Sequence, residues 1–249
     1  MTLGHTQRIG LASSLPLERA GLLDPLLLGD VDVHGESTAA HGSQKPVNST
    51  YHLGDPGTCC GKPTIASLIS DHSPSVCGLG GNDPTSRRLD EAARVIHHVA
   101  ADCSCKRERI ALLPFDQPSP ATVPPQALTP RGLRRLRRGM SLAPHSGGSS
   151  SLGPALGWAE RFAKAAPEHA AVVVFSDFLL TDLNPTQVLE RLAAFPGYVH
   201  AVVLGSRPPA QLEDDERVQL SVITPSSPPG AVAKAVFEGL TRYRKGVRA

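Results

Sequence analysis

The sequence lacks the features that mark several large classes of protein. It contains no run of about 18 apolar residues that would cross a membrane, and it does not begin with the basic and then apolar stretch of a secretory signal. The G-x-S-x-G, P-loop and H-E-x-x-H motifs are also absent, which excludes the most recognisable sites of serine hydrolases, nucleotide-binding proteins and zinc proteases. We therefore expect a cytoplasmic protein without these sites.

An excess of charge of one sign is missing as well. The 249 residues include 25 Lys and Arg against 23 Asp and Glu, a formal net charge of +2. This balance argues against a globally basic nucleic-acid-binding protein, and a hydrophobic content of 40% argues against a chain kept disordered by charge. The five cysteines are an odd number in a chain too long for a small disulfide scaffold, so they suit a reducing compartment. Arginine greatly outnumbers lysine, which is typical of GC-rich bacterial genomes.

The chain divides into two parts of different character. Residues 1–62 show no sustained hydrophobic periodicity and are rich in Gly, Ser, Thr, His and Asp, so they predict a poorly ordered N-terminal arm. Residues 63–245 alternate short apolar runs with amphipathic stretches, which predicts one folded domain. A Pro- and Arg-rich insertion occupies residues 116–146 of this domain.

The alternation predicts an α/β fold. Short apolar runs indicate strands at 64–70, 109–115, 171–176, 198–204 and 217–223, with a proline-interrupted edge strand at 121–128. Amphipathic stretches indicate helices that begin near Asp83, Leu152, Asn184 and Gly230. Strands that alternate with helices in this way form a doubly wound, mainly parallel sheet with helices on both faces.

Three predicted loops supply hard oxygen ligands at one edge of this sheet. They are 71–75 (D-H-S-P-S), 147–151 (G-G-S-S-S) and 175–177 (F-S-D). In such sheets ligands sit at the carboxyl ends of the strands, where these loops are expected. Carboxylates and hydroxyls without His or Cys suit a small hard cation such as Mg²⁺ or Mn²⁺. Because hydroxyl ligands are neutral, the ion keeps most of its charge and can accept a further carboxylate from a partner.

Taken together, the loops resemble the metal-ion-dependent adhesion site (MIDAS) of von Willebrand factor A-type (VWA) domains. That site uses a D-x-S-x-S motif, a Thr from a second loop and an Asp from a third. The resemblance spans residues 63–245 and implies a Rossmann-like sheet of six strands, one of them a short antiparallel edge strand, which suits 121–128. It also implies the following metal ligands: Asp71, Ser73, Ser75, Ser150 and Asp177.

The chain departs from the family pattern at three places without losing a ligand. Ser150 replaces the usual Thr, and the neighbouring Ser149 is an alternative ligand. His72 and Pro74 occupy positions where small residues are more common. Phe178 follows Asp177 where a Gly often stands, which predicts a narrower and more apolar rim.

The resemblance implies a protein-binding adaptor that is not an enzyme. A divalent cation would capture an Asp or Glu of a partner within an intracellular multiprotein assembly. Intracellular members of the family often act with ATPases of the AAA+ class, so we expect a partner of that kind and no nucleic acid.

Two other interpretations remain open. The order of Asp71, Ser150, Lys164 and Asp182 also resembles that of haloacid-dehalogenase-type phosphatases, in which an aspartate attacks phosphate beside Mg²⁺. Those enzymes usually carry a second Asp two positions after the first, where this chain has Ser73, and Lys164 is expected in mid-helix. The third interpretation is a metal-free structural domain whose serines cap helices and form turns.

Two further motifs have ordinary structural interpretations. The Cys103-Ser104-Cys105 segment near His97 and His98 lacks a second pair at a zinc-binding distance, so buried or idle thiols are expected there. The vicinal pair Cys59-Cys60 lies in the predicted arm, where a regulatory disulfide with another thiol is an alternative that no motif supports. The five arginines within 131–138 predict a solvated basic helix, with an anionic partner as the alternative.

Overall fold

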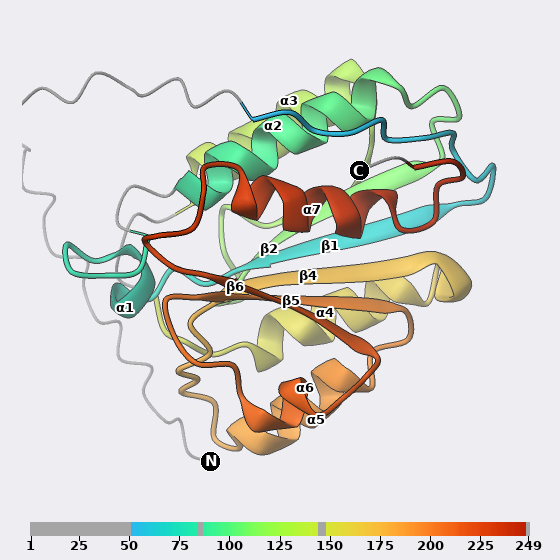
Figure 1. Ribbon diagram of the computed structural model, residues 1–249. Helices are drawn as coiled ribbons and strands as arrows, with labels where there is room; N and C mark the ends of the chain where they lie inside the picture. The colour runs from blue at the N-terminus through green and yellow to red at the C-terminus, as the bar shows by residue number, and fades with distance from the viewer. Residues whose placement is uncertain (1–50, 84–86, 144–147, 248–249) are drawn as a thin grey trace, which may run out of the picture. The chain divides into compact units, whose positions relative to one another are not determined.

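A computed structural model describes residues 51–83, 87–143 and 148–247. The predicted arm over residues 1–50 and the start of the second predicted loop lie outside the described residues. The described part has the predicted α/β architecture, a single six-stranded sheet with helices on both faces (Figure 1).

The strand order is β3-β2-β1-β4-β5-β6. The strands are β1 (Thr64–Ser70), β2 (Glu108–Pro114), β3 (Val123–Ala127), β4 (Ala170–Ser176), β5 (Tyr198–Leu204) and β6 (Val218–Ile223). All neighbours are parallel except β2 and β3, which are antiparallel. The predicted edge strand is thus confirmed, and its two prolines are tolerated because an edge strand has one side free of ladder hydrogen bonds.

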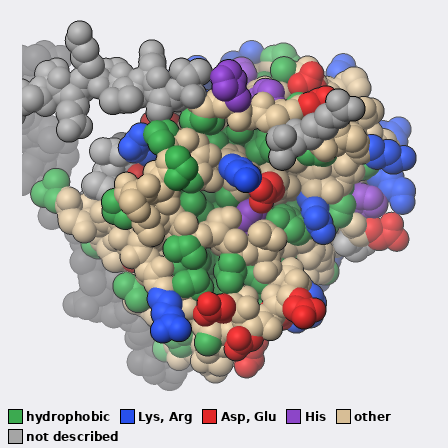
Figure 2. All heavy atoms as spheres, in the orientation of Figure 1, with side chains coloured by type: hydrophobic (Ala, Val, Ile, Leu, Met, Phe, Trp, Pro, Cys, Tyr) green, Lys and Arg blue, Asp and Glu red, His purple; other side chains and the backbone are tan. Residues whose placement is uncertain are grey.

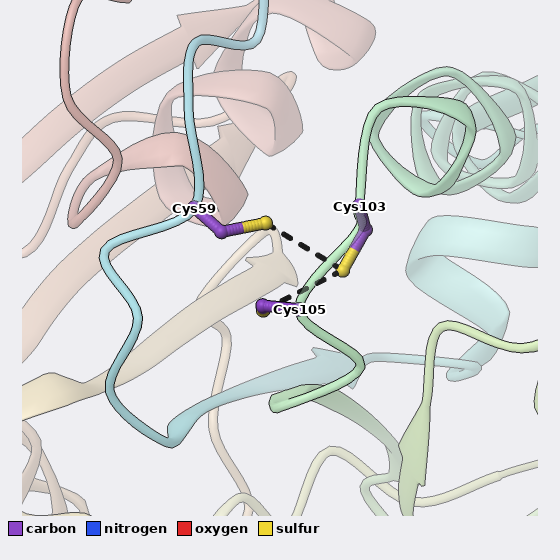
Figure 3. Close-up of side chains that lie close together, drawn as sticks. All are labelled: Cys59, Cys103 and Cys105. Carbon is purple, nitrogen blue, oxygen red and sulfur yellow. Dashed lines mark hydrogen bonds between the residues drawn. The ribbon is translucent and has the colours of Figure 1, made fainter.

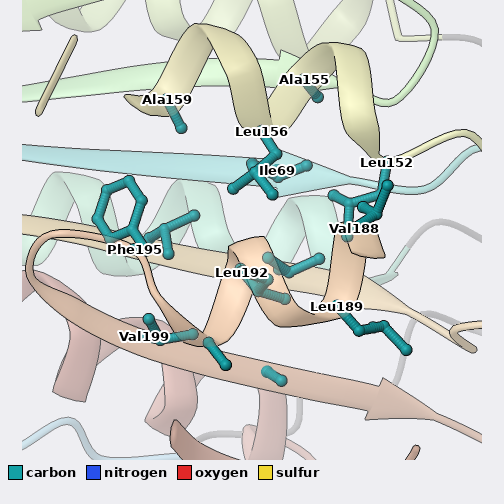
Figure 4. Close-up of a cluster of buried hydrophobic side chains, with 14 of the residues drawn as sticks. Ile69, Leu152, Ala155, Leu156, Ala159, Val188, Leu189, Leu192, Phe195 and Val199 are labelled. Atoms are coloured by element: carbon teal, nitrogen blue, oxygen red, sulfur yellow. The ribbon is translucent and has the colours of Figure 1, made fainter. Parts of the chain in front are cut away.

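Helices cover the sheet in two layers. One face carries α2 (Arg87–Ala101), α3 (Pro130–Ser141) and α7 (Ala231–Thr241), and the other carries α4 (Gly153–Ala163), α5 (Pro185–Ala193) and α6 (Ala210–Glu213) (Figure 1). A short helix, α1 (Pro74–Cys77), follows β1. Side chains of α4 and α5 meet β1 and β5 in one of two apolar cores (Figure 4). Both faces of the central strands are therefore dry, and every residue of β4 is buried.

Local capping explains where the helices begin. The Asn184 side chain accepts a hydrogen bond from the Gln187 amide at 3.2 Å, and the Asp83 carboxylate accepts from the amides of Arg87 and Arg88 at 2.9 and 3.2 Å. Each satisfies a donor that the first helical turn leaves unpaired. The helix start predicted near Asn184 is therefore confirmed, and the described part of α2 begins at Arg87, four residues after Asp83.

The arginine run lies on α3. All five arginines are exposed, whereas Gly132, Leu136 and Gly139 are buried. A Cβ at Gly139 would lie 2.3 Å from a Val123 side-chain atom, so glycine lets the helix approach β3 closely. The expected solvated basic helix is confirmed. Figure 2 shows acidic and basic side chains interspersed over one face of the molecule, which agrees with the balanced composition.

Residues 51–62, which the sequence assigned to the arm, pack against the domain in the structure. Tyr51 and Leu53 contact the apolar core under α2 and α7, and the Thr58 amide donates to the Lys245 carbonyl at 2.9 Å. Within the described ranges, no helix is both long and apolar enough to span a membrane.

Candidate metal centre

The candidate site lies where the carboxyl ends of β1 and β4 meet. These strands are parallel neighbours, and the Asp71 amide donates to the Phe175 carbonyl at 2.9 Å. The second loop joins them because the Gly148 amide donates to the His72 carbonyl and the Thr181 amide donates to the Ser150 carbonyl, both at 3.2 Å. The three loops predicted to share this edge are therefore adjacent.

Asp71 is fully buried at the base of the site. Its Oδ1 accepts from the Ser73 amide at 2.8 Å, and its Oδ2 accepts from the Ser176 hydroxyl at 2.7 Å. Burial raises the pKa of Asp71, the hydrogen bonds from Ser176 and Ser73 oppose that rise, and the nearby carboxylate of Asp177 adds to it. Two buried carboxylates therefore lie close enough to repel each other, and a positive charge between them would stabilise both.

Ser73 and Ser75 are placed by the short helix α1, which the sequence did not predict. The amides of Val76 and Cys77 donate to the Ser73 carbonyl at 3.0 and 2.8 Å, and Pro74 occupies the first helical position, where its missing amide costs nothing. This turn brings the two serine Oγ atoms to 3.0 Å from each other. Both hydroxyls of the D-x-S-x-S motif are therefore available from one side.

Asp177 carries an atom that requires explanation. Its Oδ1 accepts from the Leu179 amide at 3.1 Å, but its Oδ2 is buried and has no hydrogen-bond partner among the residues that the structure describes. A buried carboxylate oxygen without a partner is costly, by about 1–3 kcal/mol or more. A divalent cation would supply the missing interaction, so the donor set fits a small hard ion.

The structure separates the two serines of the second loop. Ser149 is exposed, and both its amide and its hydroxyl donate to the carboxylate of Asp116, the amide at 2.6 Å. Ser150 is buried and, within the described residues, makes no hydrogen bond through its hydroxyl to another side chain. Ser150 is therefore the better candidate ligand of the two.

Phe178 does not form the rim. The prediction of a narrower rim at this position is wrong because the ring is buried in the core under α4 and α5. The backbone at Phe178 has φ = 58°, in the left-handed region that favours glycine, which explains why glycine often occupies this position in the resembling pattern. Exposed apolar side chains on this loop come instead from Leu179 and Leu183.

Arg88 is a site residue that was not predicted. It is 1% exposed, pairs with Asp83 at 2.6 Å, and donates to the Asp71 carbonyl at 2.6 Å and to the Cys77 sulfur at 3.0 Å. These contacts hold the first loop in position on its buried side. The signal was present in the sequence, since Arg88 is in register with Ala92, Val95 and Val99 on the buried stripe of α2.

The residues that suggested a phosphatase do not converge. Asp182 accepts from the amides of Leu152 and Gly153, both at 2.9 Å, and so caps the first turn of α4. Lys164 is exposed at the opposite end of that helix from Ser150. Asp182 therefore has a structural role in capping, and the lysine is remote from Asp71.

The fold is that of VWA-like domains. No protein-family model and no curated sequence matches the chain. Among solved structures, the von Willebrand factor type A protein from Catenulispora acidiphila has 14% identity and a TM-score of 0.50, over 73% of this chain and 43% of that one. BatB from Bacteroides thetaiotaomicron has 12% identity and a TM-score of 0.48, over 72% of this chain and 98% of that one. At 14% identity, the likeness to the Catenulispora acidiphila protein establishes the fold alone.

Proposed function

We propose that the chain is a metal-dependent protein-binding module without catalysis of its own. Mg²⁺ or Mn²⁺ is held, directly or through water, by the ligands that the three loops supply: Asp71, Ser73, Ser75, Ser150 and Asp177. An Asp or Glu of a partner protein completes the coordination. The VWA-like fold, which often mediates protein–protein interaction, supports this assignment.

The observation that carries the proposal is the unpartnered Oδ2 of Asp177. It belongs to a carboxylate near a second buried carboxylate, Asp71, which in turn adjoins the paired hydroxyls of Ser73 and Ser75. Structural serines would account for the hydroxyls through capping and turns. They would leave the buried carboxylate oxygen unsatisfied, whereas a bound cation satisfies it.

An acidic partner suits the surroundings of the site. The last turn of α3 lies toward the same edge of the sheet, because Gly139 approaches Val123 and Leu112 near the carboxyl end of β2. The exposed Arg137 and Arg138 precede Gly139 by two residues and one residue, respectively. A carboxylate-bearing segment would therefore be attracted by the arginines as well as by the ion. We take an AAA+ ATPase as the first partner class to test.

The test uses the full chain with Asp71→Ala and, as a matched control, the exposed Asp214→Ala. For a dissociation constant of about 1 mM, 10 mM Mg²⁺ should stabilise the wild type by about 1.4 kcal/mol and raise its Tm by about 3–6 °C. The same shift is expected for Asp214→Ala and none for Asp71→Ala. Capture of a partner from lysate should be lost with EDTA and with Asp71→Ala.

Two results would overturn the proposal. If neither Mg²⁺ nor Mn²⁺ shifts the Tm of the wild type, the domain is metal-free. If the wild type hydrolyses an aryl phosphate in the presence of Mg²⁺, and Asp71→Asn abolishes that turnover, the protein is a phosphatase.

A further inference from the structure

A second cluster of ligands lies at the opposite, amino edge of the sheet. Cys59 precedes β1, while Cys103 and Cys105 lie in the turn between α2 and β2. The sulfur of Cys103 lies 3.8 Å from that of Cys59 and 3.9 Å from that of Cys105 (Figure 3). All three sulfurs are within 4.8 Å of one another. The fold has thus brought a third thiol to the C-x-C pair from 44 residues away, where the sequence indicated only idle cysteines.

We propose that Cys59, Cys103 and Cys105 bind a Zn²⁺ ion through three thiolates. Zinc–sulfur bonds are about 2.3 Å long, so neighbouring sulfurs of a tetrahedral site are about 3.8 Å apart. The two sulfur–sulfur distances that involve Cys103, 3.8 and 3.9 Å, agree with that spacing. On binding, the ion replaces the three thiol protons, which pass to the solvent.

The backbone of the turn is shaped toward the sulfurs. Lys106, directly after Cys105, has φ = 55°, a left-handed conformation that is unfavourable for a side chain with a Cβ. This turn lets the Arg107 amide donate to the Cys105 sulfur at 3.4 Å. The Arg107 guanidinium in turn donates to the Gly61 carbonyl at 2.7 Å, which ties the turn to the segment that carries Cys59. Hydrogen bonds of this kind orient and stabilise metal-bound ligands.

A buried ion pair holds the Cys59 segment in place from the other side. Arg244 pairs with Glu108 at 2.6 Å and also donates to the carbonyls of Val99 and Gly57, at 2.9 and 3.3 Å. The segment is therefore anchored to the end of α2 and to β2 before any metal binds. A site assembled in advance loses little conformational entropy on binding.

The pKa values of Cys103 and Cys105 shift in opposite directions. Burial alone would raise the pKa of Cys105, but hydrogen bonds from the Arg107 and Glu108 amides and from the neighbouring thiols lower it overall. Burial, and next the charge of Glu108, raise the pKa of Cys103 to about 12. All three side chains are only half-buried, so an ion can reach them from solvent.

Cys60 is not part of the cluster. Its sulfur donates to the Lys62 carbonyl at 3.5 Å, away from the other three. The fourth coordination position is therefore left for water or another small ligand. In this arrangement the ion would link the segment before β1, which carries Cys59, to the turn between α2 and β2. This link would be independent of the site at Asp71.

The experiment uses Co²⁺ as a spectroscopic probe on the reduced full chain, followed by displacement with Zn²⁺. We expect one equivalent of Co²⁺ to give a sulfur-to-cobalt charge-transfer band and the visible bands of a tetrahedral ion. Cys59→Ser, Cys103→Ser and Cys105→Ser should each abolish or strongly shift these bands. Cys60→Ser is the matched control and should retain them, as should Asp71→Ala, because Asp71 lies at the opposite edge of the sheet from the three cysteines.

Three outcomes would contradict the proposal. Reduced wild-type protein that shows no thiolate band with Co²⁺ would exclude the site. Loss of the band in Cys60→Ser would replace the three-cysteine assignment. If the three cysteine variants keep the wild-type zinc content after dialysis, the metal is bound elsewhere. Circular dichroism of each variant checks that it has folded, so that a lost band reports on the ligands.

Discussion

The two edges of one sheet carry opposite ligand chemistry. At the carboxyl edge, Asp71, Asp177 and neighbouring serines present hard oxygens, whereas at the amino edge three cysteines present soft sulfurs. Parallel strands explain the separation, since all loops that follow strands meet at one edge and all loops that precede them meet at the other. One domain can therefore hold two sites that differ in metal preference and share no residue.

The two edges also have two structural features in common, a buried ion pair and a residue with positive φ. Each has a buried arginine paired with a carboxylate, Arg88 with Asp83 and Arg244 with Glu108, both at 2.6 Å. The structure describes two non-glycine residues with positive φ, Phe178 and Lys106, and each directly follows a candidate ligand. Strained backbone of this kind is common where a chain must present side chains in a set direction.

The largest expected effect comes from breaking the ion pair at the amino edge. Arg244→Met leaves the Glu108 carboxylate buried without its partner and should lower the free energy of unfolding by about 3–5 kcal/mol. Arg88→Met should cost less, because the Asp83 side chain is 11% exposed and that of Glu108 only 6%. Urea denaturation measures both losses.

The exposed Arg217, paired with Asp215, is the control for these variants. Arg217→Met should change the free energy of unfolding by less than about 0.5 kcal/mol. If Arg244→Met lowers the free energy of unfolding no more than this control does, the buried pair of Arg244 and Glu108 does not stabilise the amino edge.

An intermediate effect is expected from lowering the pH, which acts through a buried histidine in the sheet. His200 in β5 is fully buried, its Nε2 lies 2.9 Å from the Ser221 hydroxyl, and burial lowers its pKa to about 4. Below the ordinary histidine pKa of about 6.5, the unfolded chain binds a proton that the folded chain excludes. The free energy of unfolding therefore decreases as the pH is lowered. The wild type should lose about 2 kcal/mol from this histidine between pH 7 and pH 5.

The measurement is urea denaturation at the two pH values, with His200→Gln as the comparison. Glutamine does not titrate, so the variant should lose less stability than the wild type on acidification. An equal loss in both proteins would show that His200 is not the cause.

The smallest expected effect comes from replacing a residue with positive φ by glycine, and it should differ between Lys106 and Phe178. Lys106→Gly relieves a left-handed conformation that costs about 1–2 kcal/mol and loses about 0.5–1 kcal/mol through the flexibility of glycine when unfolded. Because Lys106 is exposed, we expect a net gain of about 0.5 kcal/mol, seen as a higher urea midpoint. Phe178→Gly is the contrasting variant, and it should lose stability because its ring is buried. A loss of stability in Lys106→Gly would mean that its side chain makes a contribution of its own.

Much of the carboxyl edge could be predicted because its signals are local. Asp71 and Asp177 directly follow apolar runs that are buried on both faces, so finding the strands also located the ligands. The helix start at Asn184, the hydrogen bond that Asp83 accepts from the first turn of α2, and the edge strand with its prolines are likewise encoded within a few residues. The metal itself remains a prediction.

Most of the parts that could not be predicted depend on where distant segments meet. Ser149 is distinguished from Ser150 by its exposure and by its hydrogen bonds to Asp116, 33 residues earlier. The role of Arg88 depends on the carbonyl of Asp71, 17 residues before it. Phe178 turns inward because its backbone is left-handed, which no pattern of neighbouring side chains indicates.

By itself the sequence determined the α/β class, the strands and their order along the chain, and which oxygen-bearing residues follow them. These follow from hydrophobic periodicity and capping, which act over one or two turns of the chain. Only the tertiary structure decided that Cys59 meets Cys103 and Cys105, and that one oxygen of Asp177 is buried without a partner. The physical reason is that both depend on packing between elements far apart in sequence. The entropy lost in bringing such elements together is offset by burial of the whole apolar core, and not by the few residues that come into contact.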